Sequence, residues 1–223
     1  MFIKTEDMKG EKLSKPRRKF RKSFIFLIFI LIMTFSVIIF YPNIKEHVIQ
    51  SKRIKTLSSV DIPEWVTVNY IDVHDSARTG NKLRRLNNIV VHYVGNPATT
   101  ASQNREYFNN SGTEVSSHFV VGLEGEIIQC LPLNEVSAAS NHRNIDTLSI
   151  EVCHPDESGR YNKETYNSLI KLLSWLCRTL DLSAEDVIRH YDITGKLCPL
   201  YYVENPQEWE SLIFDLKSAI NSG

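Results

Sequence analysis

The chain contains few cysteines, no net charge and no internal repeat. Four cysteines in 223 residues are too few for a disulfide scaffold. A formal net charge of zero argues against a nucleic-acid-binding protein, which would carry a basic balance. Hydrophobic residues make up 42% of the chain and charged residues 23%, which excludes wholesale disorder. The length allows one globular domain with an appendage.

The neutral total hides an uneven distribution of charge. The first 23 residues hold nine basic and three acidic side chains, a net +6, and the other 200 residues hold 17 basic and 23 acidic side chains, a net −6. Between them, residues 24–41 (FIFLIFILIMTFSVIIFY) lack any charge, glycine or proline. As a helix this run spans about 27 Å, close to the roughly 30 Å hydrocarbon core of a membrane. We therefore predict a transmembrane helix over residues 24–41.

Two alternatives to an uncleaved membrane anchor fit this run less well. A buried core helix rarely lacks a polar stripe over five turns. A cleaved signal peptide has a shorter apolar region that ends in small residues, whereas Ile38, Ile39 and Phe40 occupy that place. The basic flank predicts that residues 1–23 lie in the cytoplasm and that the acidic body lies outside, with one pass through the cell membrane. Topology thus explains the basic head without a nucleic-acid partner.

The rest of the chain divides into a connecting segment and a folded body. Residues 42–85 include Pro42 and Pro63 and show no sustained periodicity, so we predict a stalk followed by an N-terminal extension that packs on the domain. Residues 86–221 form the predicted domain. In it we expect strands at residues 88–93, 117–121, 126–131, 147–153 and 187–190, and helices at residues 99–110, 163–180 and 205 to about 220.

This alternation predicts an α/β fold with a central mixed sheet flanked by helices. The turn at residues 123–125 predicts that the second and third strands form a hairpin. The last helix is expected to begin with Asn205 as N-cap, Pro206 in the first turn and Glu208 as the capping acid.

One segment carries the residue types of a metal site. His190 and Cys198 are eight residues apart, on a loop that contains Gly195 and can bring both side chains to one point. An imidazole and a thiolate together suit Zn²⁺. His92, at the end of the first predicted strand, is a candidate third ligand, and three protein ligands leave one position open, as in catalytic zinc sites. The alternative is that these are ordinary packing residues, because single histidines and cysteines are often simply buried.

Four segments in order carry a family resemblance. The sequence resembles the type 2 N-acetylmuramoyl-L-alanine amidases, which belong to the superfamily of peptidoglycan recognition proteins and phage-lysozyme amidases. The resemblance runs from about residue 84 to residue 220. Its motifs are Val90-Val91-His92-Tyr93, residues 115–121 with Gly125 and Gln129, Leu148-Ser149-Ile150-Glu151, and His190-x5-Lys196-x-Cys198-Pro199.

The resemblance implies a zinc ion held by His92, His190 and Cys198, with Lys196 beside the metal and Glu151 on the strand that faces it. Both Glu151 and Lys196 are therefore expected to be catalytic, Glu151 as acid and base and Lys196 as the group that stabilises negative charge.

The resemblance also identifies positions where this sequence departs from some members. The acid–base group of the family is either a tyrosine before the histidine of the second motif or a glutamate on a central strand. Ser117 stands at the tyrosine position, so we expect the glutamate-dependent variant. His118 matches a position that often lines the cleft and is a candidate for substrate binding, with core packing as the alternative. Tyr201 replaces the second proline of a common Cys-Pro-x-Pro ending, which changes the rim of the cleft.

The implied reaction is hydrolysis of the amide between N-acetylmuramic acid and the L-alanine of peptidoglycan stem peptides. Peptidoglycan lies outside the membrane, which agrees with the topology that the charges predict. The alternative is a binding module of the same fold that recognises peptidoglycan without cutting it, although such relatives typically lack the cysteine ligand. The other cysteines, Cys130, Cys153 and Cys177, are expected to be buried, and Cys153 shares the face of Glu151.

Overall fold

The computed structural model describes residues 17–74 and 76–222, with side chains from residue 24 onward. Residues 1–16 of the predicted basic head lie outside this described part. The chain divides into two compact units between Val48 and Ile49, and each unit is described by itself.

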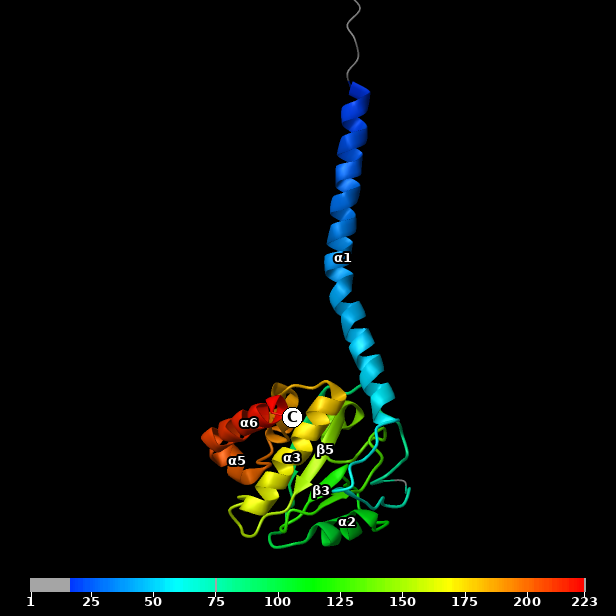
Figure 1. The fold of residues 1–223 in the computed structure, drawn as a ribbon. Helices are drawn as coiled ribbons and strands as arrows, with labels where there is room; N and C mark the ends of the chain where they lie inside the picture. The colour runs from blue at the N-terminus through cyan, green and yellow to red at the C-terminus, as the bar shows by residue number, and fades with distance from the viewer. Residues whose placement is uncertain (1–16, 75, 223) are drawn as a thin grey trace, which may run out of the picture. The chain divides into compact units, whose positions relative to one another are not determined.

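The first unit is helical in its described residues. Helix α1, Arg17–Leu57, begins here and ends in the second unit. Within the described residues it is the one helix long and apolar enough to cross a membrane, and its apolar window has a mean hydropathy of 2.9 with no share buried. Its large apolar side chains, from Phe24 to Tyr41, are exposed. The helix continues through Pro42, so residues 42–57 are helical although the sequence shows no periodicity there (Figure 1).

The second unit is built on a six-stranded sheet with the order β1-β4-β3-β5-β2-β6. Strands β3 and β4 are antiparallel, and the other four neighbouring pairs are parallel. The predicted mixed sheet and its hairpin are therefore confirmed. The strands are β1 (Thr67–Val68), β2 (Asn88–Tyr93), β3 (Phe119–Val121), β4 (Ile127–Gln129), β5 (Thr147–Val152) and β6 (Val187–Arg189).

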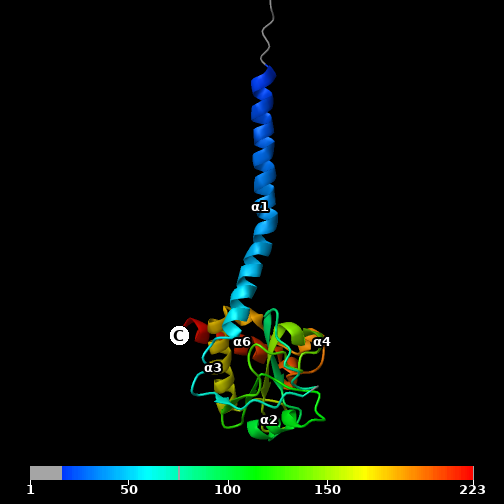
Figure 2. The ribbon, with the colours of Figure 1, turned by 90° about the vertical axis from the view of Figure 1, so that its right-hand side faces the viewer.

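Helices cover both faces of the sheet. Helices α3 and α6 lie side by side and pack with one face (Figure 1 and Figure 2), and α2 packs with the other. The described α-helices of this unit are α2 (Ala101–Asn109), α3 (Lys163–Leu180), α4 (Tyr191–Thr194), α5 (Leu200–Glu204) and α6 (Pro206–Asn221). Two 3₁₀ helices, Asn141–Asp146 and Ala184–Asp186, precede β5 and β6.

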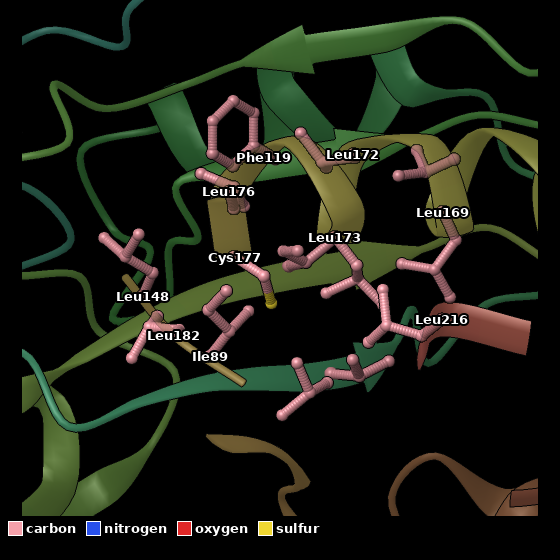
Figure 3. Packing of buried hydrophobic residues seen from close by; sticks show 14 of the residues in the cluster. Ile89, Phe119, Leu148, Leu169, Leu172, Leu173, Leu176, Cys177, Leu182 and Leu216 are labelled. Carbon is pink, nitrogen blue, oxygen red and sulfur yellow. The ribbon is translucent and has the colours of Figure 1, made fainter. Parts of the chain in front are cut away.

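The main core lies between the sheet and the pair α3 and α6. Alternate residues of β5 point into it, including Leu148 and Ile150, because successive side chains of a strand point to opposite faces. Leucines of α3 such as Leu173 meet them at helical spacing, as Figure 3 shows for residues of α3 over Ile89 and Leu148. Each fully buried leucine contributes about 1.5–3 kcal/mol. This face therefore provides most of the apolar burial.

The N-terminal ends of α3 and α6 are capped in different ways. The Asn162 side chain caps α3 by accepting from the Thr165 N–H, 2.8 Å away. For α6, Pro206 is in the first turn as predicted, but the Asn205 side chain makes no capping bond. Its amide instead donates to the Tyr201 carbonyl, 2.9 Å away. Asn205 is therefore the N-cap residue of α6, as predicted, but its side chain is held toward α5 and does not cap the helix.

The segment before β2 is part of the second unit. The Gln50 amide bonds the backbone of Leu86 in both directions, donating to the carbonyl at 3.1 Å and accepting from the N–H at 2.8 Å. The buried Arg105 donates to the carbonyls of Asn69 and Tyr70. Strand β1 adds to the edge of the sheet. The compact unit thus begins well before the first long strand.

Candidate active site

The register of the two central strands places His92 beside Glu151. These residues pair directly between the parallel strands β2 and β5. Their neighbours Val91 and Ile150 belong to the core under α3, so His92 and Glu151 point to the opposite face. Both lie near the carboxyl ends of parallel strands, where α/β proteins commonly place their sites.

A short loop brings the other two predicted ligands to the same place. His190 directly follows β6, and its N–H approaches the Val91 carbonyl at 3.3 Å. Helix α4 and Gly195, which adopts a left-handed φ of 76°, reverse the chain after His190. The Tyr191 N–H then donates to the Cys198 carbonyl at 2.9 Å and closes the loop.

The three predicted metal ligands converge. The ligand atoms of His92, His190 and Cys198 all lie within 4.8 Å of one another, and all three residues are buried. The Nδ1 atom of His92 is 3.8 Å from the Cys198 Sγ atom, and the centroids of the two imidazole rings are 4.8 Å apart. Among the described residues this is the one His, Cys, Asp and Glu cluster with spacing suited to a metal ion.

The protonation chemistry of these groups fits a zinc ion. Burial lowers the pKa of His92 well below its usual value, and the charges of His190 and Lys196 lower it further. Burial and Lys196 also lower the pKa of His190, which in both rings favours the neutral form that binds metals. Burial and Glu151 raise the pKa of Cys198 to about 12, so an ion that binds the thiolate must displace its proton.

The ring nitrogens of the two histidines have distinct surroundings. The buried Nδ1 atom of His190 has no hydrogen-bond partner, while its Nε2 atom lies 2.7 Å from the Asn141 Oδ1 atom. The Nε2 atom of His92 lies 3.4 Å from the Ser140 Oγ atom. In both rings Nε2 therefore meets a residue that is not a candidate ligand, whereas Nδ1 has no partner in His190 and contacts the candidate ligand Cys198 in His92. The orientation of the two histidine rings therefore also fits a zinc site, in which the second ring nitrogen of each ligand usually has a hydrogen-bond partner.

Glu151 provides a carboxyl group poised for proton transfer. Its Oε2 atom is shielded from solvent and has no hydrogen-bond partner. Burial raises the pKa of Glu151 to about 8, against the opposing effect of the Lys196 charge. A carboxyl group with a pKa near neutrality can both accept and donate a proton at neutral pH. Lys196 itself is exposed, on the loop between His190 and Cys198.

His118 is fully buried beside the site. Its Nδ1 atom accepts from the Ser149 N–H at 3.1 Å, and its Nε2 atom donates to the Glu135 carbonyl at 2.9 Å. Burial lowers the pKa of His118 to about 4, so the ring is neutral. Because both nitrogens bond the backbone, the structure favours the packing alternative over direct substrate contact. Ser117 is also buried and donates to the Phe119 carbonyl, which leaves Glu151 as the acid–base candidate.

Several residues around the site have no signal in the sequence. Ser140 and Asn141, which contact the two histidines, are separated from them by about 50 residues of chain and belong to no recognisable motif. Tyr161 donates from its hydroxyl to the His92 carbonyl at 3.2 Å. Cys153 lies on this face, as predicted, with its Sγ atom 3.6 Å from the Asn104 amide. All four cysteines are free and buried.

A mixed α/β sheet with a buried His–His–Cys cluster and a neighbouring carboxyl group has the features of a metallohydrolase. The family model described as N-acetylmuramoyl-L-alanine amidase (Amidase_2) matches residues 82–200. The chain therefore belongs to the N-acetylmuramoyl-L-alanine amidase family, as the motifs predict.

Relatives of known sequence cover a similar part of the chain. The N-acetylmuramoyl-L-alanine amidase BlyA of Bacillus subtilis (strain 168) is 30% identical over an alignment of 164 residues, and the match covers 64% of this chain and 44% of the relative. The N-acetylmuramoyl-L-alanine amidase CwlL of Bacillus licheniformis is 29% identical over an alignment of 160 residues, and the match again covers 64% of this chain and 44% of the relative. The chain thus spans about half the length of the curated relatives it matches.

Solved structures share the fold. The catalytic domain of XlyA is 25% identical, with a TM-score of 0.60, and the match covers 68% of this chain and 98% of that domain. PlyL is 21% identical, with a TM-score of 0.61, and the match covers 69% of this chain and 98% of that structure. The predicted fold class is confirmed.

Proposed function

We propose that this chain is a zinc-dependent N-acetylmuramoyl-L-alanine amidase, which hydrolyses the amide between N-acetylmuramic acid and L-alanine in peptidoglycan. The observation that carries the proposal is the convergence of His92, His190 and Cys198 within 4.8 Å of one another, on the face that also holds Glu151. Membership of the family and the names of the curated relatives support the choice of substrate.

Each of these residues has a chemical role in the proposed reaction. When bound, a zinc ion supplies Lewis-acid activation of the attacking water and of the amide carbonyl. Glu151 takes a proton from the water and passes it to the departing amine, a contribution of about 100- to 10,000-fold in rate. Lys196 stabilises the negative charge that develops on the carbonyl oxygen. A preorganised donor of this kind contributes about 3–4 kcal/mol, and an exposed one contributes less.

We further propose that residues 24–41 anchor the enzyme in the cell membrane, with residues 1–23 in the cytoplasm and residues 86–221 forming the amidase domain outside. The exposed apolar side chains of α1 support the anchor. The orientation is supported by the +6 charge before the apolar run and by the location of the substrate.

The proposal is tested with full-length protein in detergent micelles and purified peptidoglycan. We expect release of stem peptides with a free L-alanine amino group, loss of release when a chelator removes the metal, and recovery when zinc is added. Release that continues unchanged in chelator would overturn the role of zinc. Binding to peptidoglycan without release would instead favour the non-catalytic recognition module.

A check on the named residues follows from the same assay. Cys198→Ser and Glu151→Gln should both lower the rate of release by at least about 100-fold, but only Cys198→Ser should also lose the metal. A Glu151→Gln variant with unchanged activity would contradict the role given to that carboxyl group.

A further inference from the structure

Two consecutive residues each contact one of the two histidines of the candidate metal site. The Ser140 Oγ atom lies 3.4 Å from Nε2 of His92, and the Asn141 Oδ1 atom lies 2.7 Å from Nε2 of His190. These residues are called the Ser140–Asn141 clip below. They lie at the start of the 3₁₀ helix Asn141–Asp146, on neither of the strands that carry the histidines.

The chemistry of the clip determines which ring nitrogen keeps its lone pair. The Oδ1 atom of Asn141 can only accept a hydrogen bond, so the hydrogen of the neutral His190 ring must be on Nε2. The lone pair then remains on Nδ1, the buried atom without a partner. Ser140 meets the same atom, Nε2, of His92, and the Nδ1 atom of His92 contacts the Sγ atom of Cys198, the third candidate ligand, at 3.8 Å.

The clip is held in place by its own contacts. The Asn144 Oδ1 atom accepts from the N–H groups of Ala139 at 3.1 Å and Ser140 at 2.6 Å. The Ser140 Oγ atom also lies 3.2 Å from the Ser149 Oγ atom on β5. The clip is therefore tied to the strand beside His92.

The backbone of Asn141 is unusual. Its φ is 53°, in the left-handed region that residues other than glycine seldom adopt, although asparagine tolerates it better than most. Such conformations concentrate at functional sites, where the surrounding structure compensates for their strain. Here the conformation occurs at the residue whose side chain reaches His190.

We propose that the Ser140–Asn141 clip is a positioning element: Asn141 fixes His190 in the Nε2–H tautomer, Ser140 engages Nε2 of His92, and the Nδ1 atoms of both rings are thereby directed to one metal position. The consequence for zinc affinity rests on the proposed function, whereas the tautomer is a property of the metal-free protein. Hydrogen-bond partners of ligating histidines typically affect metal affinity by about 10- to 100-fold. Asn141, with the shorter contact, makes the larger contribution.

Three variants and a matched control test the clip in full-length protein in detergent micelles. Asn141→Gly removes the acceptor while glycine accepts the left-handed backbone, and Asn141→Asp keeps an acceptor at the same position. Ser140→Ala removes the weaker contact. The control is Asp181→Gly, because Asp181 has a similar φ of 57° but caps the end of α3, away from the cluster.

Two measurements are made on each variant. In metal-free protein, nitrogen chemical shifts and two-bond couplings of His190 report which ring nitrogen carries the hydrogen. In a second measurement, competition with a chromogenic chelator gives the zinc affinity, and the absorption spectrum with Co²⁺ reports the ligand geometry.

We expect wild-type His190 to be the Nε2–H tautomer and Asn141→Gly to show a mixture, with zinc affinity about 10- to 100-fold lower and an altered Co²⁺ spectrum. Asn141→Asp should keep the wild-type tautomer and zinc affinity. Ser140→Ala should lose less zinc affinity than Asn141→Gly, and the control Asp181→Gly should match wild type. An Asn141→Gly protein with the wild-type tautomer and affinity would overturn the clip. Wild-type protein with the expected tautomer and tight zinc, but no release of stem peptides, would overturn the proposed function and leave the clip standing.

Discussion

The two faces of the central sheet have opposite characters, although they are made from the same strands. On β5, Leu148 and Ile150 enter the core under α3, while Ser149 and Glu151 point to the face that holds the candidate site. Three buried side-chain atoms among the described residues lack a hydrogen-bond partner, and two of them, in Glu151 and His190, are at the site. Because unpartnered buried polar atoms reduce stability, the part of this face around the site is built for chemistry, whereas the core under α3 is built for stability.

The largest expected effect comes from changing cysteines on the two faces. Cys198→Ser removes a metal ligand, so zinc affinity and peptide release should fall by more than the roughly 100-fold expected from losing a hydrogen-bond partner of a ligand. Cys177→Ser is the matched change on the core face, where Cys177 of α3 is fully buried. It should lower thermal stability and leave zinc affinity at the wild-type value. Equal zinc affinities in the two variants would break the distinction between the faces.

Glu151→Gln should lower the rate of peptide release by about 100- to 10,000-fold while zinc remains bound, because the proton acceptor is lost and the ligands are not. Metal analysis and a peptide-release assay on the same preparation measure both quantities. Loss of zinc from this variant would mean that Glu151 supports the metal site rather than proton transfer.

Leu173→Ala, on the core face, should lower the stability of the fold without changing zinc affinity. Leu173 is fully buried between α3 and the sheet, so the cavity should lower the free energy of unfolding by about 2–5 kcal/mol. Zinc affinity measured well below the unfolding temperature should not change. Denaturant unfolding gives the first quantity and chelator competition the second, and a large loss of zinc affinity would show that the two faces are coupled.

The remaining effect is a dependence of stability on pH that belongs to Glu151 and appears only in the metal-free protein. Burial raises its pKa from 4.5 to about 8 in the folded, metal-free protein. Between these values the folded state holds a proton that the unfolded state has released, so the stability of metal-free protein should fall as pH rises toward 8. The change should be on the order of a few kcal/mol and should be absent in Glu151→Gln. If the stability of the wild-type protein and that of Glu151→Gln depended on pH in the same way, the raised pKa of Glu151 would be contradicted.

The sequence predicts the long, periodic elements well. Strand β5 alternates between core and site residues, and α3 repeats leucines at helical spacing, so both were recognisable from their periods. Strand β1 has two residues and α4 has four, too few to show any period. Residues 42–57 are helical without a recognisable stripe. Asn205 is the N-cap of α6 as predicted, but the bond that its side chain makes to α5 instead of capping could not be foreseen.

The candidate site was predictable only where its residues belong to motifs. The His190 to Cys198 loop has a characteristic spacing, and the structure places both residues with His92. The contacts of Ser140 and Asn141 depend on how a loop folds over strands about 50 residues away, which no local pattern encodes. Positioning residues of this kind become visible only in three dimensions.

The central claim is that the polar face of the sheet holds zinc through one cysteine and two histidines. X-ray absorption spectroscopy at the zinc edge of full-length protein tests it most directly. The account predicts one sulfur ligand at about 2.3 Å and two imidazole nitrogens at about 2.0 Å, with the sulfur lost in Cys198→Ser. A spectrum without sulfur in the wild-type protein, or one that Cys198→Ser leaves unchanged, would contradict it.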